Sequence, residues 1–236
     1  MNEAPSARHV VVTGAAGALG RAVVRQLLDQ GMRLALIEHR MAHLHVAFPE
    51  LVDDSRHLLL EADVSATDAM ADAAGRVLQA FPHVDGLVHI AGGFEMGQPV
   101  HALDRAAWDR MMNLNAWSFV AVTQALVPSM IVRKSGSVVA VSAKTASRGA
   151  ANMAAYIASK SALQRLVEAA AAELGPHGVR VNSIAPSVLD TPANRQAMPD
   201  ADPAEWVPTP VAAQTIGFLL SPAAAALHGQ HLALDG

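Results

Sequence analysis

The chain has 236 residues, of which 52% are hydrophobic and 16% charged, a composition that excludes a disordered chain and a coiled coil. The formal net charge of −4 provides no basic surface for nucleic acid, and the lack of cysteine excludes disulfides and thiolate metal ligands. The apolar stretches fall short of the roughly 20 residues of a membrane span, and residues 1–5 do not open a signal peptide. We therefore expect a cytoplasmic globular protein with no nucleic-acid or membrane partner.

Short runs rich in Val, Ile and Leu alternate along the chain with longer segments whose apolar residues recur every three or four positions. The short runs predict strands buried on both faces, at residues 9–13, 33–38, 56–61, 85–90, 137–142, 179–185 and 231–234. The longer segments predict helices, at residues 19–28, 70–81, 108–130, 153–174 and 211–220. This order predicts a single α/β domain over residues 1–236, a Rossmann-like doubly wound sheet of about seven parallel strands with helices on both faces. A (β/α)8 barrel is the rival.

Residues 186–210 interrupt this alternation. They contain six prolines and show little helical periodicity. They follow the sixth predicted strand, at the end of a parallel sheet where ligands bind. A loop of this length in a compact domain is usually a lid or a binding segment. We therefore expect a substrate loop or lid over residues 187–212.

A glycine-rich turn, TGAAGALG at residues 13–20, joins the first predicted strand to the first predicted helix. Such a turn lets backbone N–H groups and a helix N-terminus approach a pyrophosphate closely. The position between strand and helix therefore predicts dinucleotide binding by Gly14, Gly17, Leu19 and Gly20. A purely structural turn is the alternative.

Glu38 ends the second predicted strand, eighteen residues after Gly20. A carboxylate at this place accepts hydrogen bonds from ribose hydroxyls and repels a 2′-phosphate, which favours NAD. Arg21 and Arg40 stand close enough in sequence to cradle a phosphate, so NADP remains open. A solvated strand end is the alternative interpretation of Glu38.

Two further sites follow the third and fourth predicted strands. Asp63 is placed to accept a hydrogen bond from an adenine amino group. Ala91 and Gly92 would let a ribose approach the backbone. Ordinary loop residues are the alternative for each.

The single tyrosine of the chain, Tyr156, precedes Lys160 by four residues within a predicted helix, so both side chains share one face. A phenol with a pKa of about 10 is a poor acid–base catalyst at neutral pH. A neighbouring ammonium favours the phenolate, so we expect Lys160 to lower the pKa of Tyr156. The pair predicts general acid–base catalysis on a substrate oxygen; a core tyrosine beside a snorkelling lysine is the alternative.

Taken together, these motifs resemble the short-chain dehydrogenase/reductase family. The glycine turn, Asn115, the Tyr156-x-x-x-Lys160 pair and residues 186–191 carry the resemblance, which covers essentially the whole chain. It implies an NAD(P)-dependent oxidoreductase that transfers a hydride between nicotinamide and a small carbonyl or alcohol. A non-catalytic dinucleotide-sensing protein of the same fold is the alternative from another class.

The resemblance also implies a role for each matching residue. Tyr156 would exchange a proton with the substrate oxygen, while Lys160 holds the nicotinamide ribose and lowers the pKa of Tyr156. Asn115 would anchor a water that links Lys160 to solvent, and Leu189 and Thr191 would hold the carboxamide. The implied cofactor-binding residues are Gly14, Gly17, Leu19, Gly20, Glu38, Asp63, Val64, Ala91, Gly92, Tyr156, Lys160, Pro186, Leu189 and Thr191.

The sequence departs from the family pattern at the catalytic serine. The family's serine stands thirteen residues before the tyrosine, a position that is Ala143 here, and Ser142 stands one residue earlier. Either a small loop adjustment brings Ser142 into the catalytic role, or the serine is absent. The family's asparagine after the fourth strand is also replaced, by His89.

The resemblance leaves the substrate open between two branches. Residues 189–208 look like dihydropteridine reductases, which work without the serine and reduce a pterin. Residues 108–115 and the C-terminus look more like 3-oxoacyl reductases of fatty-acid synthesis. Candidate substrate contacts, each equally compatible with packing, are Phe94, Met96, Asn152, Met153 and Trp206.

Eleven histidines raise the question of a metal site. His43 and His45 form the closest pair, but no third ligand follows at metal-like spacing. We therefore expect no metal.

The assembly is inferred from the family resemblance. Long helices that start near Asp104 and Asn152 carry broad apolar faces, and in relatives such helices pair across a two-fold axis. The strand at residues 231–234 is expected at a second interface. A homotetramer is therefore expected, with a dimer as second choice.

Overall fold

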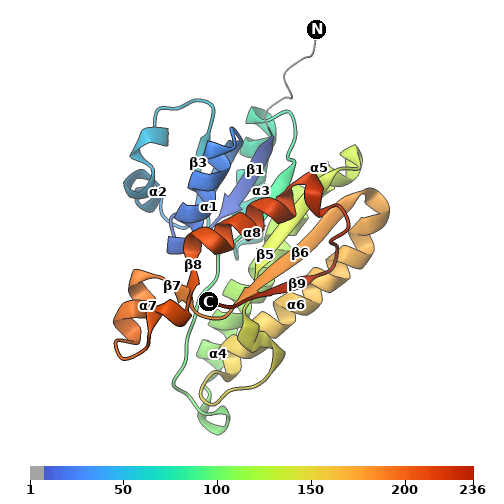
Figure 1. Cartoon of the computed structure of the whole chain (residues 1–236). Coiled ribbons are helices and arrows are strands. Elements are labelled where there is room, and N and C mark those ends of the chain that lie inside the picture. Colours follow the sequence, from blue (N-terminus) through green and yellow to red (C-terminus); the bar gives the residue numbers. More distant parts are fainter. Residues whose placement is uncertain (1–7) are drawn as a thin grey trace.

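The computed structural model describes residues 8–236, and this part of the chain forms a central sheet of seven strands. Residues 1–7, which carry the expectation of no signal peptide, lie outside the described residues. The strand order is β3-β2-β1-β4-β5-β6-β9, with every neighbouring pair parallel (Figure 1). The strands are β1 (His9–Thr13), β2 (Arg33–Glu38), β3 (Leu58–Glu61), β4 (Gly86–His89), β5 (Gly136–Val141), β6 (Val179–Pro186) and β9 (His231–Leu234). The predicted α/β fold class is confirmed.

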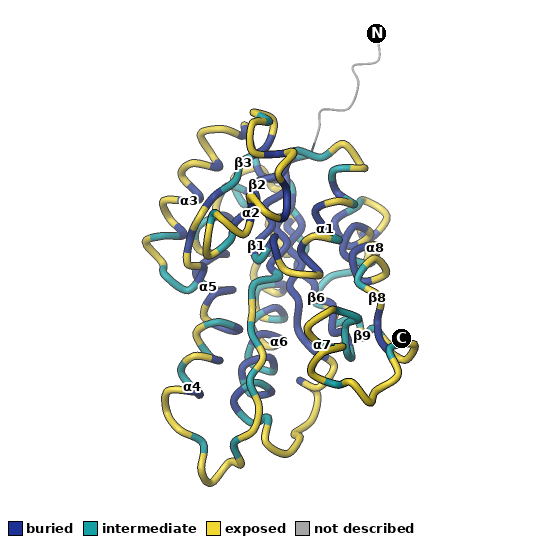
Figure 2. The backbone as a smooth tube through the Cα atoms, turned by 90° about the vertical axis from the view of Figure 1, so that its left-hand side faces the viewer, coloured by how far each residue is buried: buried dark blue, intermediate teal, exposed yellow. Residues whose placement is uncertain are grey.

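Helices cover both faces of this sheet. One face carries α1 and α8, which pack against each other, and the opposite face carries α3, α5 and α6 (Figure 1). In Figure 2 the central strands of the sheet are buried, whereas the helices turn exposed faces outward. The helices are α1 (Ala18–Asp29), α2 (Met41–Ala47), α3 (Thr67–Ala80), α4 (Arg105–Met112), α5 (Ser118–Arg133), α6 (Ala154–Leu174), α7 (Pro192–Ala197) and α8 (Thr209–Leu220).

Alternate residues along a strand belong to two different hydrophobic cores, one on each face of the sheet. In β1, Val11 joins the core under α3, α5 and α6, whereas Val10 and Val12 join the core under α1 and α8. Because both faces of the strand are buried, its sequence is apolar throughout rather than alternating. This burial explains why the strand positions were predictable from composition.

The helix expected over residues 108–130 is interrupted in the structure. It consists of α4, a π-helical turn over Asn113–Trp117, and α5. A π turn inserts one residue without breaking the run of apolar side chains, so hydrophobic periodicity does not reveal it. The short helix α2 was also missed.

The segment after β6 is more ordered than the expected irregular loop. It contains a two-stranded parallel pair, β7 (Leu189–Asp190) with β8 (Val207–Pro208), and the helix α7 between them. Thr191 starts α7 because its Oγ1 accepts a hydrogen bond from the Asn194 N–H at 3.1 Å, and Pro192 is compatible with a first helical turn. We call residues 187–212 the flap.

One helical segment contradicts the expectation that every apolar stretch is shorter than a membrane span. Residues Arg105–Arg133 form a 29-residue helix long and apolar enough to cross a membrane. Half of its apolar window is buried inside the protein, and Phe119 and Leu126 belong to the core beneath the sheet. Packing against the sheet therefore accounts for this composition.

Candidate active site

The glycine turn brings the backbone of β1 and the first turn of α1 together at the carboxyl end of the sheet. Gly14 has a φ of +66°, and a Cβ there would lie 2.7 Å from the Ala91 nitrogen. A Cβ at Gly20 would lie 2.3 Å from the Gly14 carbonyl oxygen. Neither position accepts a side chain, so both must be glycine. The first turn of α1, whose N–H groups have no partners within the helix, therefore opens onto the adjacent cleft.

This cleft has a volume of about 410 Å³ and lies beyond the ends of β1, β2, β3 and β4. That size falls within the range of small-molecule sites. Residues expected to bind the cofactor that do line it are Gly14, Gly17, Leu19, Gly20, Glu38, Asp63, Val64, Ala91, Gly92, Leu189 and Thr191. Lining residues that the sequence analysis missed are Ala18, Ile37, His39, Ala62, Ile90 and Leu114. Most of these adjoin a recognised motif residue, which is the signal that could have found them.

Glu38 connects the end of β2 to the glycine turn. Its Oε2 accepts a hydrogen bond from the Ala16 N–H at 3.1 Å, and its Oε1 accepts one from the His39 N–H at 3.0 Å. The carboxylate therefore lies at the cleft wall beside the turn. Arg21 turns back to the same loop, where its Nε donates to the Ala16 carbonyl at 2.8 Å.

Asp63 lines the same cleft, just after β3. Its Oδ1 accepts hydrogen bonds from the Ser65 N–H at 2.9 Å and from the Ser65 hydroxyl at 2.7 Å. These bonds stabilise the carboxylate and lower the pKa of Asp63. The Asp63 carboxylate is therefore ionised at neutral pH.

The flap contributes two predicted residues to the cleft, whereas Pro186, just before the flap, does not reach it. Leu189 and Thr191 line it. Pro186 is buried at the end of β6, in register with Leu234, and does not line the cleft. Within the flap, Arg195 forms a bidentate ion pair with Asp190 at 2.7 and 2.8 Å.

Tyr156 is the third residue of α6, and its side chain is half-buried. Within residues 8–236 no hydrogen-bond partner is found for its hydroxyl, and its ring meets the Phe94 ring edge to face. Burial raises the pKa of Tyr156 to about 12. The expected lowering by Lys160 is therefore wrong for the protein alone, because the cost of placing a phenolate in a partly dry environment dominates.

Lys160 is buried one helical turn further along α6. Its Nζ donates to the Val141 carbonyl at 2.9 Å, at the end of β5. Burial lowers the pKa of Lys160 to about 8, so the amine is still mostly charged at neutral pH. A Cβ at Gly92 would lie 3.1 Å from this Nζ and 2.8 Å from Asn115 Oδ1, so Gly92 leaves room for both groups.

Asn115 sits in the π turn, and its side-chain amide makes three hydrogen bonds to backbone and hydroxyl groups. Its Oδ1 accepts from the Gly93 N–H at 2.9 Å, while its Nδ2 donates to the Gly93 carbonyl and to the Ser159 hydroxyl, both at 3.0 Å. The side chain therefore joins the loop after β4 to α6. π turns often occur at functional sites, because the extra residue redirects a side chain.

The Ser142 hydroxyl is engaged by the backbone of α6 rather than by Tyr156. Its Oγ bonds to the Lys160 carbonyl at 3.3 Å and is buried. The next residue, Ala143, has extended backbone, so its side chain projects to the opposite side. The geometry favours the alternative in which the serine is absent.

The candidate substrate residues divide into three groups. A small cavity of about 20 Å³ beside the start of α6 is lined by Met96, Asn152 and Met153. Phe94 is 58% exposed and lies against Tyr156. Trp206 is only 5% exposed, so in this structure its contribution is packing, not substrate contact.

His89, whose part in the site was missed, occupies a buried network behind the loop after β4. Its Nε2 lies 3.1 Å from the Ser118 hydroxyl, which itself donates to the Leu114 carbonyl at 2.7 Å. The Nε2 therefore carries the proton, and Nδ1 accepts from the Thr13 hydroxyl at 2.9 Å. Burial, with a smaller effect of the Lys160 charge, lowers the pKa of His89 to about 3. The neutral ring thus ties the glycine turn to the π turn.

A comparison with protein families identifies this arrangement. The chain matches the family described as short chain dehydrogenase over residues 8–202. The chain belongs to the short-chain dehydrogenase family. This match confirms the family resemblance that the sequence motifs indicated.

Individual short-chain dehydrogenases match over nearly the full length. Cis-4-hydroxycyclohexanecarboxylate dehydrogenase of Sinomonas cyclohexanicum is 32% identical, covering 100% of this chain and 98% of the relative. Cyclopentanol dehydrogenase of Comamonas sp. (strain NCIMB 9872) is 30% identical, covering 96% and 95%. The structure of a 3-oxoacyl-[acyl-carrier protein] reductase from Brucella melitensis with bound NAD has a TM-score of 0.85 and 25% identity, covering 96% and 89%. This short-chain dehydrogenase is therefore an NAD(P)-dependent oxidoreductase, and the side-chain-free glycine cradle fits the dinucleotide.

Proposed function

We propose that this protein interconverts a small cyclic secondary alcohol and its ketone with NAD as cofactor. The observation that carries the proposal is the Tyr156 hydroxyl, half-buried near the carboxyl end of the sheet with no hydrogen-bond partner found within residues 8–236. The apolar edge of Phe94 against this phenol supports a ring-shaped substrate. The names of two relatives, which specify a hydroxycyclohexane carboxylate and cyclopentanol, support the same class.

In the proposed reaction Tyr156 handles the proton. During reduction its hydroxyl gives a proton to the carbonyl oxygen of the substrate, and during oxidation the phenolate takes a proton from the alcohol. A bound nicotinamide supplies or accepts the hydride. Because burial keeps the phenol protonated at neutral pH, the protein is prepared for the reducing direction.

Lys160 and Asn115 support Tyr156 in this reaction, the first through its charge and the second through the position of a loop. The Lys160 ammonium, held by the Val141 carbonyl, places a positive charge one turn from Tyr156 and stabilises a phenolate that forms during turnover. Asn115 holds the loop after β4 against α6 through Gly93 and Ser159. This contact sets the separation between the cleft wall and Tyr156.

The preference for NAD rests on Glu38. Its carboxylate lies in the cleft wall beside the glycine turn, where the ribose of the adenosine half would approach. A negative charge there repels a 2′-phosphate. Arg21 donates its Nε to the Ala16 carbonyl, so this N–H is engaged by the turn itself and is not free for a phosphate.

The flap is proposed to close over the nicotinamide half of the cofactor. Leu189 and Thr191 line the cleft, and the Asp190–Arg195 ion pair with the β7–β8 pair gives the flap its own internal structure. A folded flap can move as a unit about its ends. Saturating NADH should therefore slow hydrogen exchange in residues 187–212; unchanged exchange would contradict closure.

The function is tested by NADH consumption with a substrate panel. Cyclohexanone and cyclopentanone represent the proposed class, and a quinonoid dihydropterin and a 3-oxoacyl thioester represent the two classes that family resemblance leaves open. We expect turnover with the cyclic ketones. Tyr156→Phe should lower kcat by at least about 100-fold, the usual size of a general-acid contribution, with the Kd for NADH unchanged.

Lys160→Met should lower kcat as well, and Lys134→Met is its matched control because Lys134 ends α5 at the far end of the sheet. Turnover that survives Tyr156→Phe would refute the acid–base role. Turnover confined to the pterin or to the thioester would replace the cyclic ketones as the substrate class. NADH binding without turnover on any of them would instead favour a sensor.

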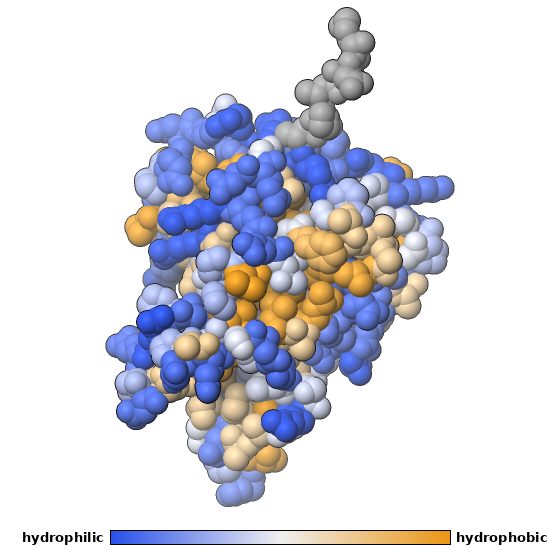
Figure 3. All heavy atoms as spheres, in the orientation of Figure 1, coloured by the Kyte–Doolittle hydropathy of each residue, from blue (hydrophilic) through white to orange (hydrophobic). Residues whose placement is uncertain are grey.

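We also propose that four copies of the chain assemble through two apolar surfaces. On α8, Val211 and Phe218 are exposed, and Figure 3 shows hydrophobic side chains gathered over α8 and beside β9. The second surface is α5 with the π turn that precedes it, where Val132 and Trp117 are exposed. Light scattering should give about four times the chain mass of 24.6 kDa, and a monomer mass would contradict the proposal.

A further inference from the structure

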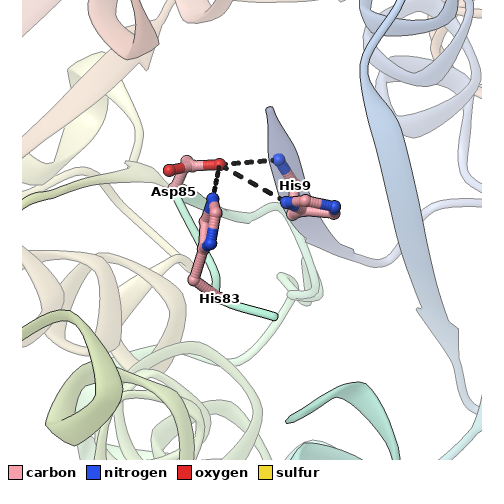
Figure 4. Close-up of side chains that lie close together, drawn as sticks. All are labelled: His9, His83 and Asp85. Atoms are coloured by element: carbon pink, nitrogen blue, oxygen red, sulfur yellow. Dashed lines mark hydrogen bonds and ion pairs between the residues drawn. The ribbon is translucent and has the colours of Figure 1, made fainter. Parts of the chain in front are cut away.

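Two histidines and an aspartate converge at the end of the sheet opposite the cleft. His9 begins β1, and His83 and Asp85 lie in the segment that leads into β4 (Figure 4). Asp85 Oδ2 is 3.3 Å from His83 Nε2 and 3.7 Å from His9 Nδ1. One ligand atom from each residue lies within 4.8 Å of the other two.

His9 is the unusual member of this cluster. It is only 4% exposed, and neither of its ring nitrogens has a hydrogen-bond partner within residues 8–236. Buried polar atoms are nearly always paired, so an orphaned imidazole calls for an explanation. Its Nδ1 faces Asp85 Oδ2 across a gap that is too long for a hydrogen bond.

We propose that this cluster binds a divalent transition-metal ion, of which Zn²⁺ is the best fit, through His9 Nδ1, His83 Nε2 and Asp85 Oδ2. Imidazole nitrogens and a carboxylate oxygen are ordinary zinc ligands, with bonds of about 2.0–2.2 Å. Tetrahedral coordination at that length places neighbouring ligand atoms about 3.3 Å apart. Two of the three separations are already close to this value, so small side-chain movements complete the site.

Contacts around the carboxylate hold it in place for this role. Asp85 Oδ2 also accepts from the His9 backbone N–H at 2.8 Å, and Oδ1 accepts from Arg133 Nη1 at 3.1 Å. Such outer contacts commonly orient metal ligands.

Two nearby cations repel a bound dication and therefore limit the affinity of the site for it. Arg133 pairs with Asp85, and the Arg33 guanidinium stacks 5.3 Å from the centre of the Phe81 ring, itself 4.8 Å from the His9 ring. We therefore expect a site of moderate affinity. The His83 side chain is 23% exposed, which provides an entry route and room for a water as the remaining ligand.

A metal here would act on stability. The ligands join the starts of β1 and β4, which are neighbours in the sheet, whereas the cleft lies at the strands' other ends. The expectation of no metal site came from spacing along the chain, which cannot bring residue 9 next to residues 83 and 85. Only the pairing of β1 with β4 does so.

The test uses the full chain, stripped with EDTA and titrated with Zn²⁺. Calorimetry should show one Zn²⁺ per chain, and a 100-fold excess over Kd should raise Tm by roughly 5–10 °C. Co²⁺ in place of Zn²⁺ should give visible absorption bands of a site with nitrogen and oxygen ligands.

His83→Gln should weaken Zn²⁺ binding at least about 10-fold and remove the Tm shift, whereas the matched control His45→Gln, an exposed position on α2, should keep both. Asp85→Asn is the second variant, because asparagine can still accept from the His9 N–H. Circular dichroism without metal checks that each variant folds. Absence of binding in the wild type, or equal binding by His83→Gln, would overturn the proposal, as would loss of binding in His45→Gln alone.

Discussion

The ring of Phe94 meets the ring of Tyr156 edge to face, with centroids 4.9 Å apart and planes at 78°. One ring comes from the loop after β4 and the other from α6, so this contact joins the two elements that flank the proposed reaction site. Phe94 is largely exposed and therefore offers its remaining surface to a substrate. The same contact helps to keep water from the phenol.

Removing the Phe94 ring should raise the KM for the substrate more than it lowers kcat. Phe94→Ala is expected to raise the KM for a cyclic ketone about 10-fold, the size of a lost aromatic contact plus its buried area, with kcat changed less than about 3-fold. Steady-state kinetics measures both constants. Val46→Ala, which removes an exposed apolar side chain on α2, is the control. An unchanged KM for Phe94→Ala would mean that the ring only packs.

The Glu38 charge should decide the choice of nucleotide. Glu38→Gln keeps the size of the side chain but removes its charge, and we expect the ratio of NADPH to NADH Kd values to fall by about 10- to 100-fold. Fluorescence titration with both nucleotides measures the ratio. Glu61→Gln, at the end of β3 where the carboxylate caps the Met41 N–H, is the matched control. If the ratio does not move, Glu38 serves only to hold the glycine turn through Ala16.

The two residues at the end of β5 should respond in opposite ways. Ser142→Ala loses a buried hydrogen bond to the Lys160 carbonyl and should cost about 1 kcal/mol of stability, with kcat within about 3-fold of wild type. Ala143→Ser adds a hydroxyl on the other side of the strand and should raise kcat/KM by supplying a donor to the substrate oxygen. Urea unfolding and kinetics measure these effects. A 100-fold loss of kcat in Ser142→Ala would instead assign the catalytic serine to position 142.

His89 should make the fold sensitive to acid. Burial holds its pKa at about 3 in the folded chain, whereas the unfolded chain takes up this proton near 6.5. Falling pH therefore favours unfolding from about 6.5 downward, by roughly 1.4 kcal/mol per pH unit for this one proton.

His89→Asn should remove this contribution, so its free energy of unfolding should depend less steeply on pH between 6.5 and 5. Urea titrations at several pH values measure the slope. His9 and His57, whose pKa values burial also lowers, are present in both proteins and cancel in the comparison. Equal slopes would show that His89 is accessible to protons in the folded state.

The sequence by itself determined the class of fold and the position of the cofactor turn. Buried parallel strands such as β1 are apolar on both faces, so composition alone locates them. Gly14 and Gly20 were predictable for a similar reason, because only glycine fits where a Cβ would overlap the backbone. These requirements are local, so they can be recognised from a short stretch of neighbouring residues in the sequence.

Tertiary structure alone decided the properties that depend on surroundings. The pKa of Tyr156 rises because of burial, although the adjacent lysine had suggested the reverse. Ser142 turns toward the Lys160 carbonyl, and His9 reaches Asp85 across the sheet. Burial, side-chain direction and contacts between distant segments arise only when strands pair and helices pack, since each depends on residues far away in the chain.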